Sequence, residues 1–228
     1  MKSLARLDLA RMVASHLPEE GFVNLGIGAP THVGDYLPEG SGVMLHSENG
    51  ILNVGAKPDP GEEDSDLINA GKAPITLSIG GSFFDSSTSF SMMRGGHIDI
   101  AILGAFQVSQ QGDIANWSAG DSDGSPPGIG GAIDLAVGAK AIWVMMDHVT
   151  RDGRPRILKT CTLPLTATKV VSRIFTSMAI IDVAPGGLLV ESLLEGLSFE
   201  DVQRATEANL TLVPKPGTIK MDGSVSYL

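Results

Sequence analysis

Short runs of apolar residues recur along the chain without polar alternation, and most of them begin or end next to glycine. Runs of this kind are typical of strands that are buried on both faces, as in parallel or mixed sheets covered by helices. Strands are therefore expected at 22–25, 43–45, 75–79, 98–103, 141–146 and 179–183.

Segments between these runs predict the covering helices. Apolar residues in the N-terminal segment recur with helical spacing, and Ser198 with Asp201 fits a capping box at the start of a later helix. Helices are expected at 7–17, 31–37, 131–139 and 199–208. The prediction is one α/β domain over residues 1–228: an open mixed or parallel sheet with flanking helices. Its Gly-rich loops would gather at strand ends, where such folds bind ligands.

Composition narrows the classes of function. The chain has 228 residues, of which 43% are hydrophobic, enough for one substantial core. A net charge of −10 argues against binding to nucleic acid or to an anionic membrane surface, because both require a basic patch. Charges scattered through the N-terminal segment do not fit a signal peptide, and a single cysteine, Cys161, fits a reducing compartment. We therefore expect a cytoplasmic protein.

The stretch VMLHSENGIL, residues 43–52, places a carboxylate where an apolar run ends. Glu48 would be held on a rigid strand end, and the Asn49-Gly50 pair after it adds little steric bulk. A carboxylate in this position can act as a general base or as a nucleophile that forms an acyl intermediate. From the residues alone, a polar turn without a chemical role remains the stronger interpretation.

A second interpretation makes Glu48 a ribose-binding residue. Gly26 and Gly28 form a G-x-G pattern after a predicted strand, and Glu48 lies 22 residues after Gly26, as in dinucleotide-binding folds. However, Thr31 stands where the third glycine belongs, and Pro30 removes one N–H group from the loop. These two departures make nucleotide binding the weaker alternative.

Other chemistry finds little support in the sequence. Ser47 has no nucleophile-elbow motif around it, and the chain's five histidines lack metal-ligand spacing, so we expect no metal site. The segment GIGGAIDLA, residues 128–136, leads from a glycine loop into a predicted helix. Backbone N–H groups of such a loop can face an oxyanion.

The pair Asp152-Gly153 predicts a hairpin turn between two apolar runs. Arg151, Arg154 and Arg156 lie around this turn. We interpret the three arginines as surface charges, and binding of an anionic partner is the alternative.

Several segments together resemble the B subunits of the family I CoA-transferases, which act on 3-oxoacids. The resemblance covers most of the chain and includes, in the same order, VNLGIGAPT, LHSENGIL, GEEDSDLINAGK, SFSMMRGGHIDIAILGAFQVS, GDIANW, GIGGAIDLAVGAK and CTLPLT. The segments MMRGGHIDIAILGAFQVS and VMMDH are most similar to the members that act on 3-oxoadipate. Members that act on acetoacetate are close relatives, so acetoacetate is the alternative acceptor.

The resemblance implies roles for particular residues. Glu48 would be the nucleophile, which takes CoA from succinyl-CoA as a glutamyl-CoA thioester and passes it to the 3-oxoacid. CoA thioesters would be substrates, and no cofactor is expected. The remaining candidates for substrate or CoA binding are Asn49, Gly104, Ala105, Gln107, Gly130 and Gly131.

The resemblance also implies a partner. The family assembles from A and B subunits, so we expect a CoA-transferase A subunit as partner, in an α2β2 or similar assembly. A noncatalytic subunit that only binds CoA or a nucleotide is the alternative from a different class. One departure is Asn53, which stands where the family has glycine or alanine after the two apolar residues that follow S-E-N-G.

Overall fold

The computed structural model describes residues 2–120 and 129–227. Its helices are α1 (Arg6–Ala14), the 3₁₀ helix η1 (Ala29–Tyr36), α2 (Ser86–Arg94), α3 (Ala132–Gly138) and α4 (Phe199–Arg204). Its strands are β1 (Glu20–Leu25), β2 (Gly42–Ser47), β3 (Ile51–Val54), β4 (Leu77–Phe83), β5 (Ile100–Leu103), β6 (Gln107–Ser109), β7 (Ile114–Ala115), β8 (Ala141–Met146), β9 (Ile157–Leu158), β10 (Val171–Thr176), β11 (Ala179–Ala184), β12 (Gly187–Leu194), β13 (Leu210–Ile219) and β14 (Val225–Ser226).

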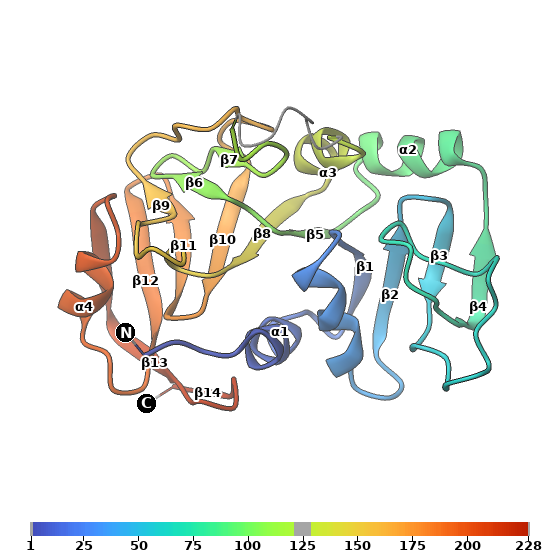
Figure 1. Ribbon diagram of the computed structural model, residues 1–228, viewed down its shortest axis with the longest axis horizontal. Coiled ribbons are helices and arrows are strands. Elements are labelled where there is room, and N and C mark those ends of the chain that lie inside the picture. Colours follow the sequence, from blue (N-terminus) through green and yellow to red (C-terminus); the bar gives the residue numbers. More distant parts are fainter. Residues whose placement is uncertain (1, 121–128, 228) are drawn as a thin grey trace.

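Eleven of these strands form one mixed sheet in the order β14-β13-β12-β11-β10-β8-β5-β1-β2-β3-β4 (Figure 1). The five central strands, from β10 to β2, are all parallel, while β3 and β4 join one edge as antiparallel neighbours. The chain leaves β1 for β2 on one side, and later returns to place β5 and β8 on the other side. This reversal is a topological switch point, where open α/β sheets bind ligands at the carboxyl ends of their strands.

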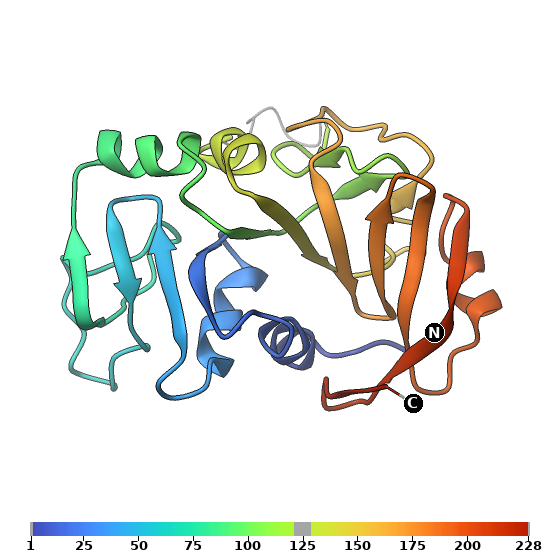
Figure 2. The same ribbon diagram turned by 180° about the vertical axis from the view of Figure 1, so that it is seen from behind.

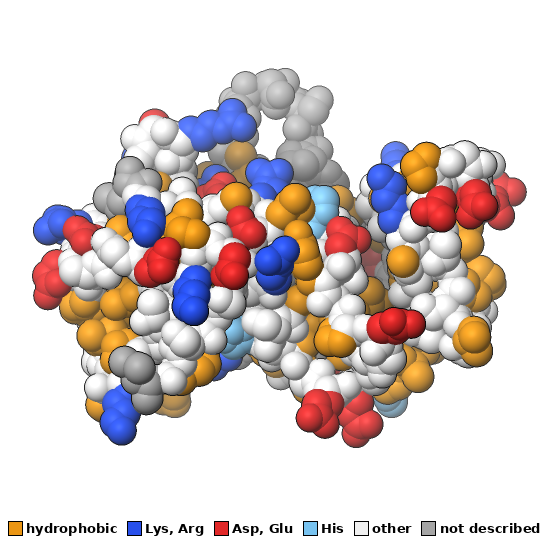
Figure 3. All heavy atoms as spheres, turned by 90° about the horizontal axis from the view of Figure 1, so that it is seen from below, with side chains coloured by type: hydrophobic (Ala, Val, Ile, Leu, Met, Phe, Trp, Pro, Cys, Tyr) orange, Lys and Arg blue, Asp and Glu red, His pale blue; other side chains and the backbone are white. Residues whose placement is uncertain are grey.

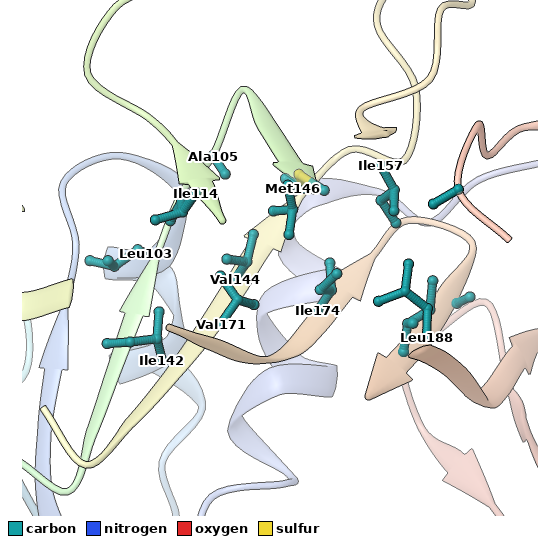
Figure 4. Close-up of a cluster of buried hydrophobic side chains, with 14 of the residues drawn as sticks. Leu103, Ala105, Ile114, Ile142, Val144, Met146, Ile157, Val171, Ile174 and Leu188 are labelled. Carbon is teal, nitrogen blue, oxygen red and sulfur yellow. The ribbon is translucent and has the colours of Figure 1, made fainter. Parts of the chain in front are cut away.

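The central strands are buried on both faces, as the apolar runs predict. In β5, Ile100 and Ile102 pack into a cluster with α1, whereas Ala101 and Leu103 pack into a second cluster with α3. Figures 1 and 2 show α1 and η1 on one side of the sheet and α2, α3 and the small sheet β7-β6-β9 on the other. Figure 4 shows the second cluster, in which side chains of β5, β8 and β10 lie together with Ile114 and Ile157 of the small sheet.

The predicted elements are largely confirmed, with one clear error. Ser198 and Asp201 form the expected capping box of α4, and all six apolar runs overlap strands. The run at 75–79 was expected to be buried on both faces, but it leads into β4, whose Ile79 is fully exposed. Burial fails there because β4 is an edge strand that pairs only with β3 in the described sheet.

The surface carries charges of both signs. Viewed from below, acidic and basic side chains are interspersed with apolar ones over the visible face (Figure 3). No helix in the described chain combines the length and apolar composition that crossing a membrane requires. Within residues 2–120 and 129–227, no three His, Cys, Asp or Glu side chains are grouped to hold a metal ion.

Candidate active site

The hairpin of β2 and β3 holds Glu48 at its turn. Strand β2 ends at Ser47, whose carbonyl accepts a hydrogen bond from the Gly50 N–H at 3.0 Å. The Gly50 carbonyl in turn accepts from the Phe84 N–H at 3.0 Å. Gly50 has φ 114°, and a Cβ atom there would collide with the carbonyl oxygen of Phe84. Glycine after Glu48-Asn49 is therefore required by the backbone geometry and by space.

Asn53 shows why the chain departs from the family pattern after this turn. Its φ of 62° lies in the left-handed region, which asparagine tolerates better than most residues, and the β3–β4 register shifts at this point. The Asn53 Nδ2 donates to the carbonyl of Ile79 at 3.0 Å. Asn53 thus forms a bulge on β3 and ties it to the edge strand β4.

A buried histidine supports the strand just before Glu48. The Nδ1 atom of His46 accepts a hydrogen bond from Asn24 Nδ2 at 3.0 Å, and its Nε2 lies 3.1 Å from the Ser89 hydroxyl. Burial lowers the pKa of His46 to about 4, so the ring is neutral at pH 7. Because both ring nitrogens have partners, His46 fixes the end of β2 against β1 and α2 without adding a charge.

The Gly-Gly segment before α3 lies directly beside the Glu48 carboxylate. A Cβ atom on Gly131 would stand 2.5 Å from Oε2 and 3.0 Å from the carboxyl carbon of Glu48. A Cβ on Gly130 would stand 3.8 Å from Oε1. Only glycine at position 131 leaves the carboxylate where it is, so the two segments are fitted to each other.

The electrostatics of Glu48 are set by opposing effects. Burial raises the pKa of the Glu48 carboxyl, the Gly131 backbone N–H lowers it, and the negative charge of Asp134 raises it. The effect of Asp134 is tempered by Arg94, whose Nε lies 2.6 Å from an Asp134 oxygen. Glu48 is therefore a half-buried carboxylate with reduced solvation, which increases its reactivity as a nucleophile once it is ionised.

The side chain of Glu48 lines a cavity of about 460 Å³. Its walls come from the carboxyl ends of β1, β5 and β8 and from the start of α3, as expected at the switch point of the sheet. The described lining includes Arg6, Gly26, Ile27, Pro30, Glu48, Gly104, Ala105, Phe106, Asn116, Trp117, Gly130, Gly131, Met146, Asp147 and Arg156.

The structure brings together five of the seven residues expected at the site: Glu48, Gly104, Ala105, Gly130 and Gly131. The other two lie outside the described cavity lining. Asn49 donates from Nδ2 to the Ile68 carbonyl at 2.8 Å. Gln107 accepts from the N–H groups of Thr162 at 2.8 Å and Leu163 at 3.0 Å. In this chain both side chains hold loops together.

Several lining residues were not anticipated from the sequence. Asp147 follows directly after β8, so its position at a strand end was a usable signal. Arg6, Asn116 and Trp117 had no such signal. Arg156 was interpreted as a surface charge, which is wrong, because it lines the cavity and its Nε atom is buried.

The geometry disfavours the nucleotide-binding interpretation of Gly26 and Gly28. Gly26 is pinned to β5, since its N–H donates to the Ile102 carbonyl at 2.8 Å. After Gly28 the chain forms the 3₁₀ helix η1 with Pro30 in its first turn. An α-helix N-terminus with free N–H groups, which binds pyrophosphate in dinucleotide-binding folds, is not formed by residues 29–36.

Cys161 is unsuited to nucleophilic chemistry. Burial, together with the negative charge of Asp113, raises the pKa of its thiol to about 11. The thiolate is the reactive form, so Cys161 is inert at neutral pH.

Comparison with known proteins decides the family. The sequence model described as "Coenzyme A transferase" matches residues 6–205. The chain belongs to the coenzyme A transferase family. It is 54% identical over 207 residues to the B subunit of the "3-oxoadipate CoA-transferase" of Acinetobacter baylyi, covering 91% of this chain and 95% of that one. It is 47% identical over 208 residues to the B subunit of the "Probable succinyl-CoA:3-ketoacid coenzyme A transferase" of Bacillus subtilis, with coverage of 91% and 95%.

The fold is also that of coenzyme A transferases. The crystal structure of an acyl-CoA transferase apoenzyme from Escherichia coli O157:H7 superposes with a TM-score of 0.73 over 96% of this chain. The two sequences are 18% identical, and this chain spans 43% of the length of that protein. The predicted fold class and the resemblance to the B subunits of this family are thus confirmed.

Proposed function

We propose that this chain is the B subunit of a CoA-transferase that moves CoA from succinyl-CoA to 3-oxoadipate, with Glu48 as the nucleophile. The observation that supports this most strongly is the Glu48 carboxylate, held beside Gly131 in a cavity at the strand ends. The names of the Acinetobacter and Bacillus relatives support a 3-oxoacid as acceptor. Acetoacetate is the alternative acceptor, because the Bacillus relative is named for 3-ketoacids in general.

The first half-reaction places CoA on the enzyme. A Glu48 oxygen attacks the thioester carbon of succinyl-CoA, the C–S bond breaks, and a glutamyl-succinyl anhydride and CoA thiolate form. The thiolate then attacks the glutamyl carbonyl, which releases succinate and leaves a glutamyl-CoA thioester. Each step exchanges one acyl bond for another, so neither a net proton nor an external energy source is needed.

The second half-reaction repeats these steps in reverse. The carboxylate of 3-oxoadipate attacks the glutamyl thioester, which gives a mixed anhydride and CoA thiolate. The thiolate attacks the 3-oxoadipyl carbonyl, and 3-oxoadipyl-CoA leaves while Glu48 regains its carboxylate. Gly131 contributes a backbone N–H next to the reacting carboxyl, where it would stabilise the oxyanions that form at Glu48.

The proposal includes a partner subunit. Both relatives are named as B subunits, which supports a separate A subunit for this chain as well. We expect the partner to complete the site and hold much of CoA, in an α2β2 or similar assembly. Purified separately, the chain should not transfer CoA, and unaided transfer would refute this part of the proposal.

The proposed function is tested by comparing Glu48→Gln with the wild type, both co-purified with the partner subunit. Glu48→Gln should lower CoA transfer at least about 10⁴-fold while CoA binding stays nearly intact, since the amide cannot attack a thioester. Glu48→Asp is a matched control that keeps the carboxylate but retracts it, and it should retain a small residual rate. A noncatalytic CoA-binding subunit predicts the opposite: weaker CoA binding and unchanged turnover in Glu48→Gln.

A further inference from the structure

The cavity beside Glu48 contains two arginines that no described carboxylate neutralises. Arg6 opens α1 and Arg156 precedes β9, and both contribute to the cavity wall. Neither forms an ion pair within the described chain. The acidic residues of the lining are Glu48 and Asp147. Positive charge thus lies in the same cavity as the proposed nucleophile.

Arg156 is held firmly by its backbone. Its N–H donates to the His148 carbonyl at 3.2 Å, and its carbonyl accepts from the Val108 N–H at 3.0 Å. The hydrogen-bonding capacity of its side chain, in contrast, is not satisfied: the Nε atom is buried and has no hydrogen-bond partner among the described residues. A buried donor without a partner is costly, so a small shift of the side chain that brings the guanidinium onto acceptor oxygens of a ligand would be favourable.

The neighbouring Arg154 shows that this arrangement is particular to Arg156. Arg154 lies on the same hairpin, but its side chain is exposed and its Nε pairs with Asp152 at 2.7 Å. Two residues further along, Arg156 lines the cavity and forms no ion pair within the described chain. The hairpin therefore supplies one solvated arginine and one that is available to a ligand.

We propose that Arg156, assisted by Arg6, binds the distal carboxylate of a dicarboxylic acyl substrate while Glu48 reacts with its other end. This rests on the proposed function and deepens it by naming the residues that recognise the second carboxylate of the substrate. Arginine binds carboxylates through two parallel N–H···O bonds, a geometry that lysine cannot supply. Glu48 and Arg156, which line the same cavity, would then act on the two ends of a dicarboxylic acyl group.

A carboxylate fits this position better than a phosphate of CoA. A cavity of about 460 Å³ has the size of a site for a small molecule, which suits an acyl group and not the whole of CoA. The consequence is selectivity: a monocarboxylic 3-oxoacid would leave the arginine unpaired in the cavity. Sites that hydrogen-bond a substrate group discriminate strongly against analogues that lack it.

The test compares two six-carbon acceptors, 3-oxoadipate and 3-oxohexanoate, which differ in the distal carboxylate. The enzyme is the chain co-purified with its partner subunit, and succinyl-CoA is the donor. In a ping-pong reaction kcat/KM for the acceptor reports only the second half-reaction, so effects on the donor do not interfere. Arg156→Gln should lower kcat/KM for 3-oxoadipate roughly 10- to 100-fold and leave that for 3-oxohexanoate within about twofold.

Two further variants complete the experiment. Arg156→Lys keeps the positive charge but cannot form two parallel hydrogen bonds, so it should give an intermediate loss of kcat/KM for 3-oxoadipate alone. This variant also tests the inference if Arg156→Gln fails to assemble. Arg154→Gln is the matched control and should leave both acceptors unaffected.

Three results would overturn the inference: an equal loss for both acceptors, as expected for contact with CoA; no loss for either; or failure of both Arg156 variants to assemble. If the wild-type complex transfers no CoA to any acceptor, the proposed function itself fails, which is a separate outcome.

Discussion

The Glu48 carboxylate and the Cα of Gly131 are so close that a methyl group cannot stand between them. A Cβ on Gly131 would lie 2.5 Å from a Glu48 oxygen, although the Gly131 backbone, with φ −80° and ψ 5°, is open to any residue. Space beside the carboxylate, and not backbone freedom, therefore explains glycine at this position. Glycine at position 131 is thus required by the active site and not by the fold.

Gly131→Ala should inactivate the enzyme without unfolding it. The added methyl group displaces the flexible Glu48 side chain, and a displacement of about 1 Å can lower catalysis about 100-fold. The free energy of unfolding should change by only about 1 kcal/mol, because the methyl group meets the flexible end of Glu48 and alanine is only a poorer helix N-cap than glycine. Transfer kinetics and thermal unfolding of the co-purified complex measure the two effects.

Gly104→Ala is the control for that prediction. Gly104 also lines the cavity, but a Cβ there would meet no described atom within 4 Å. It should retain most of the activity. Equal losses of activity in the two variants would show that any added volume in the cavity lowers activity. The close approach of Glu48 and Gly131 would then not be the cause.

Glu48→Gln should make the protein more stable at neutral pH. Burial raises the pKa of Glu48, so keeping it ionised in the folded chain costs free energy relative to the unfolded chain. This cost is fully present above the raised pKa and disappears as the pH falls below the unfolded value of about 4.3. Melting temperatures should therefore be higher for Glu48→Gln at pH 7–8 and converge with the wild type near pH 4. A lower melting temperature at pH 8 would argue that the carboxylate is stabilised by its surroundings.

His46 should make stability depend on pH in a different window. Burial lowers the pKa of His46 to about 4, whereas the unfolded residue titrates near 6.5. The unfolded chain thus binds a proton first, and stability is lost as the pH falls from 6.5 towards 4. The slope contributed by one histidine approaches about 1.4 kcal/mol per pH unit. Denaturant unfolding across this pH range should show that the free energy of unfolding falls less steeply with decreasing pH in His46→Gln than in the wild type. An unchanged slope would mean that His46 is protonated in the fold.

Gly50→Ala should destabilise the hairpin that carries Glu48. The substitution forces a side chain onto φ 114° and against the carbonyl oxygen of Phe84, so a loss of at least about 2 kcal/mol is expected. Gly153→Ala is the matched control, because Gly153 also has positive φ but open space around its Cβ. Denaturant unfolding should show a clearly smaller loss for Gly153→Ala. Equal losses would attribute the effect to backbone strain alone.

Much of the site could be predicted because it depends on local pattern. The apolar run before Glu48 predicts its strand, and strand ends of parallel sheets meet at one edge, so the resemblance to a known family only had to assign the chemistry. Gly131 was also identified, since a glycine loop leading into a helix is visible in the sequence.

What could not be predicted depends on contacts between distant segments. Arg154 and Arg156 both follow the same hairpin turn in the sequence, and only the pairing of the Arg156 backbone with Val108 of β6 shows which of them lies beside the cavity. Gln107 directly follows a residue that lines the cavity, but its side-chain oxygen accepts a hydrogen bond from Thr162, 55 residues away. Strand β11 was predicted from its apolar run, whereas β12 to β14 were missed, and in β12 alternating burial weakens the signal of such a run.

The central claim is that Glu48 carries CoA covalently. Its most direct test is mass spectrometry of peptides from the co-purified complex after brief incubation with succinyl-CoA and no acceptor. The proposed mechanism predicts a CoA-sized mass increase on the peptide that contains Glu48, which is absent in Glu48→Gln and disappears when 3-oxoadipate is added. A complex that transfers CoA while this peptide remains unmodified throughout the reaction would contradict it.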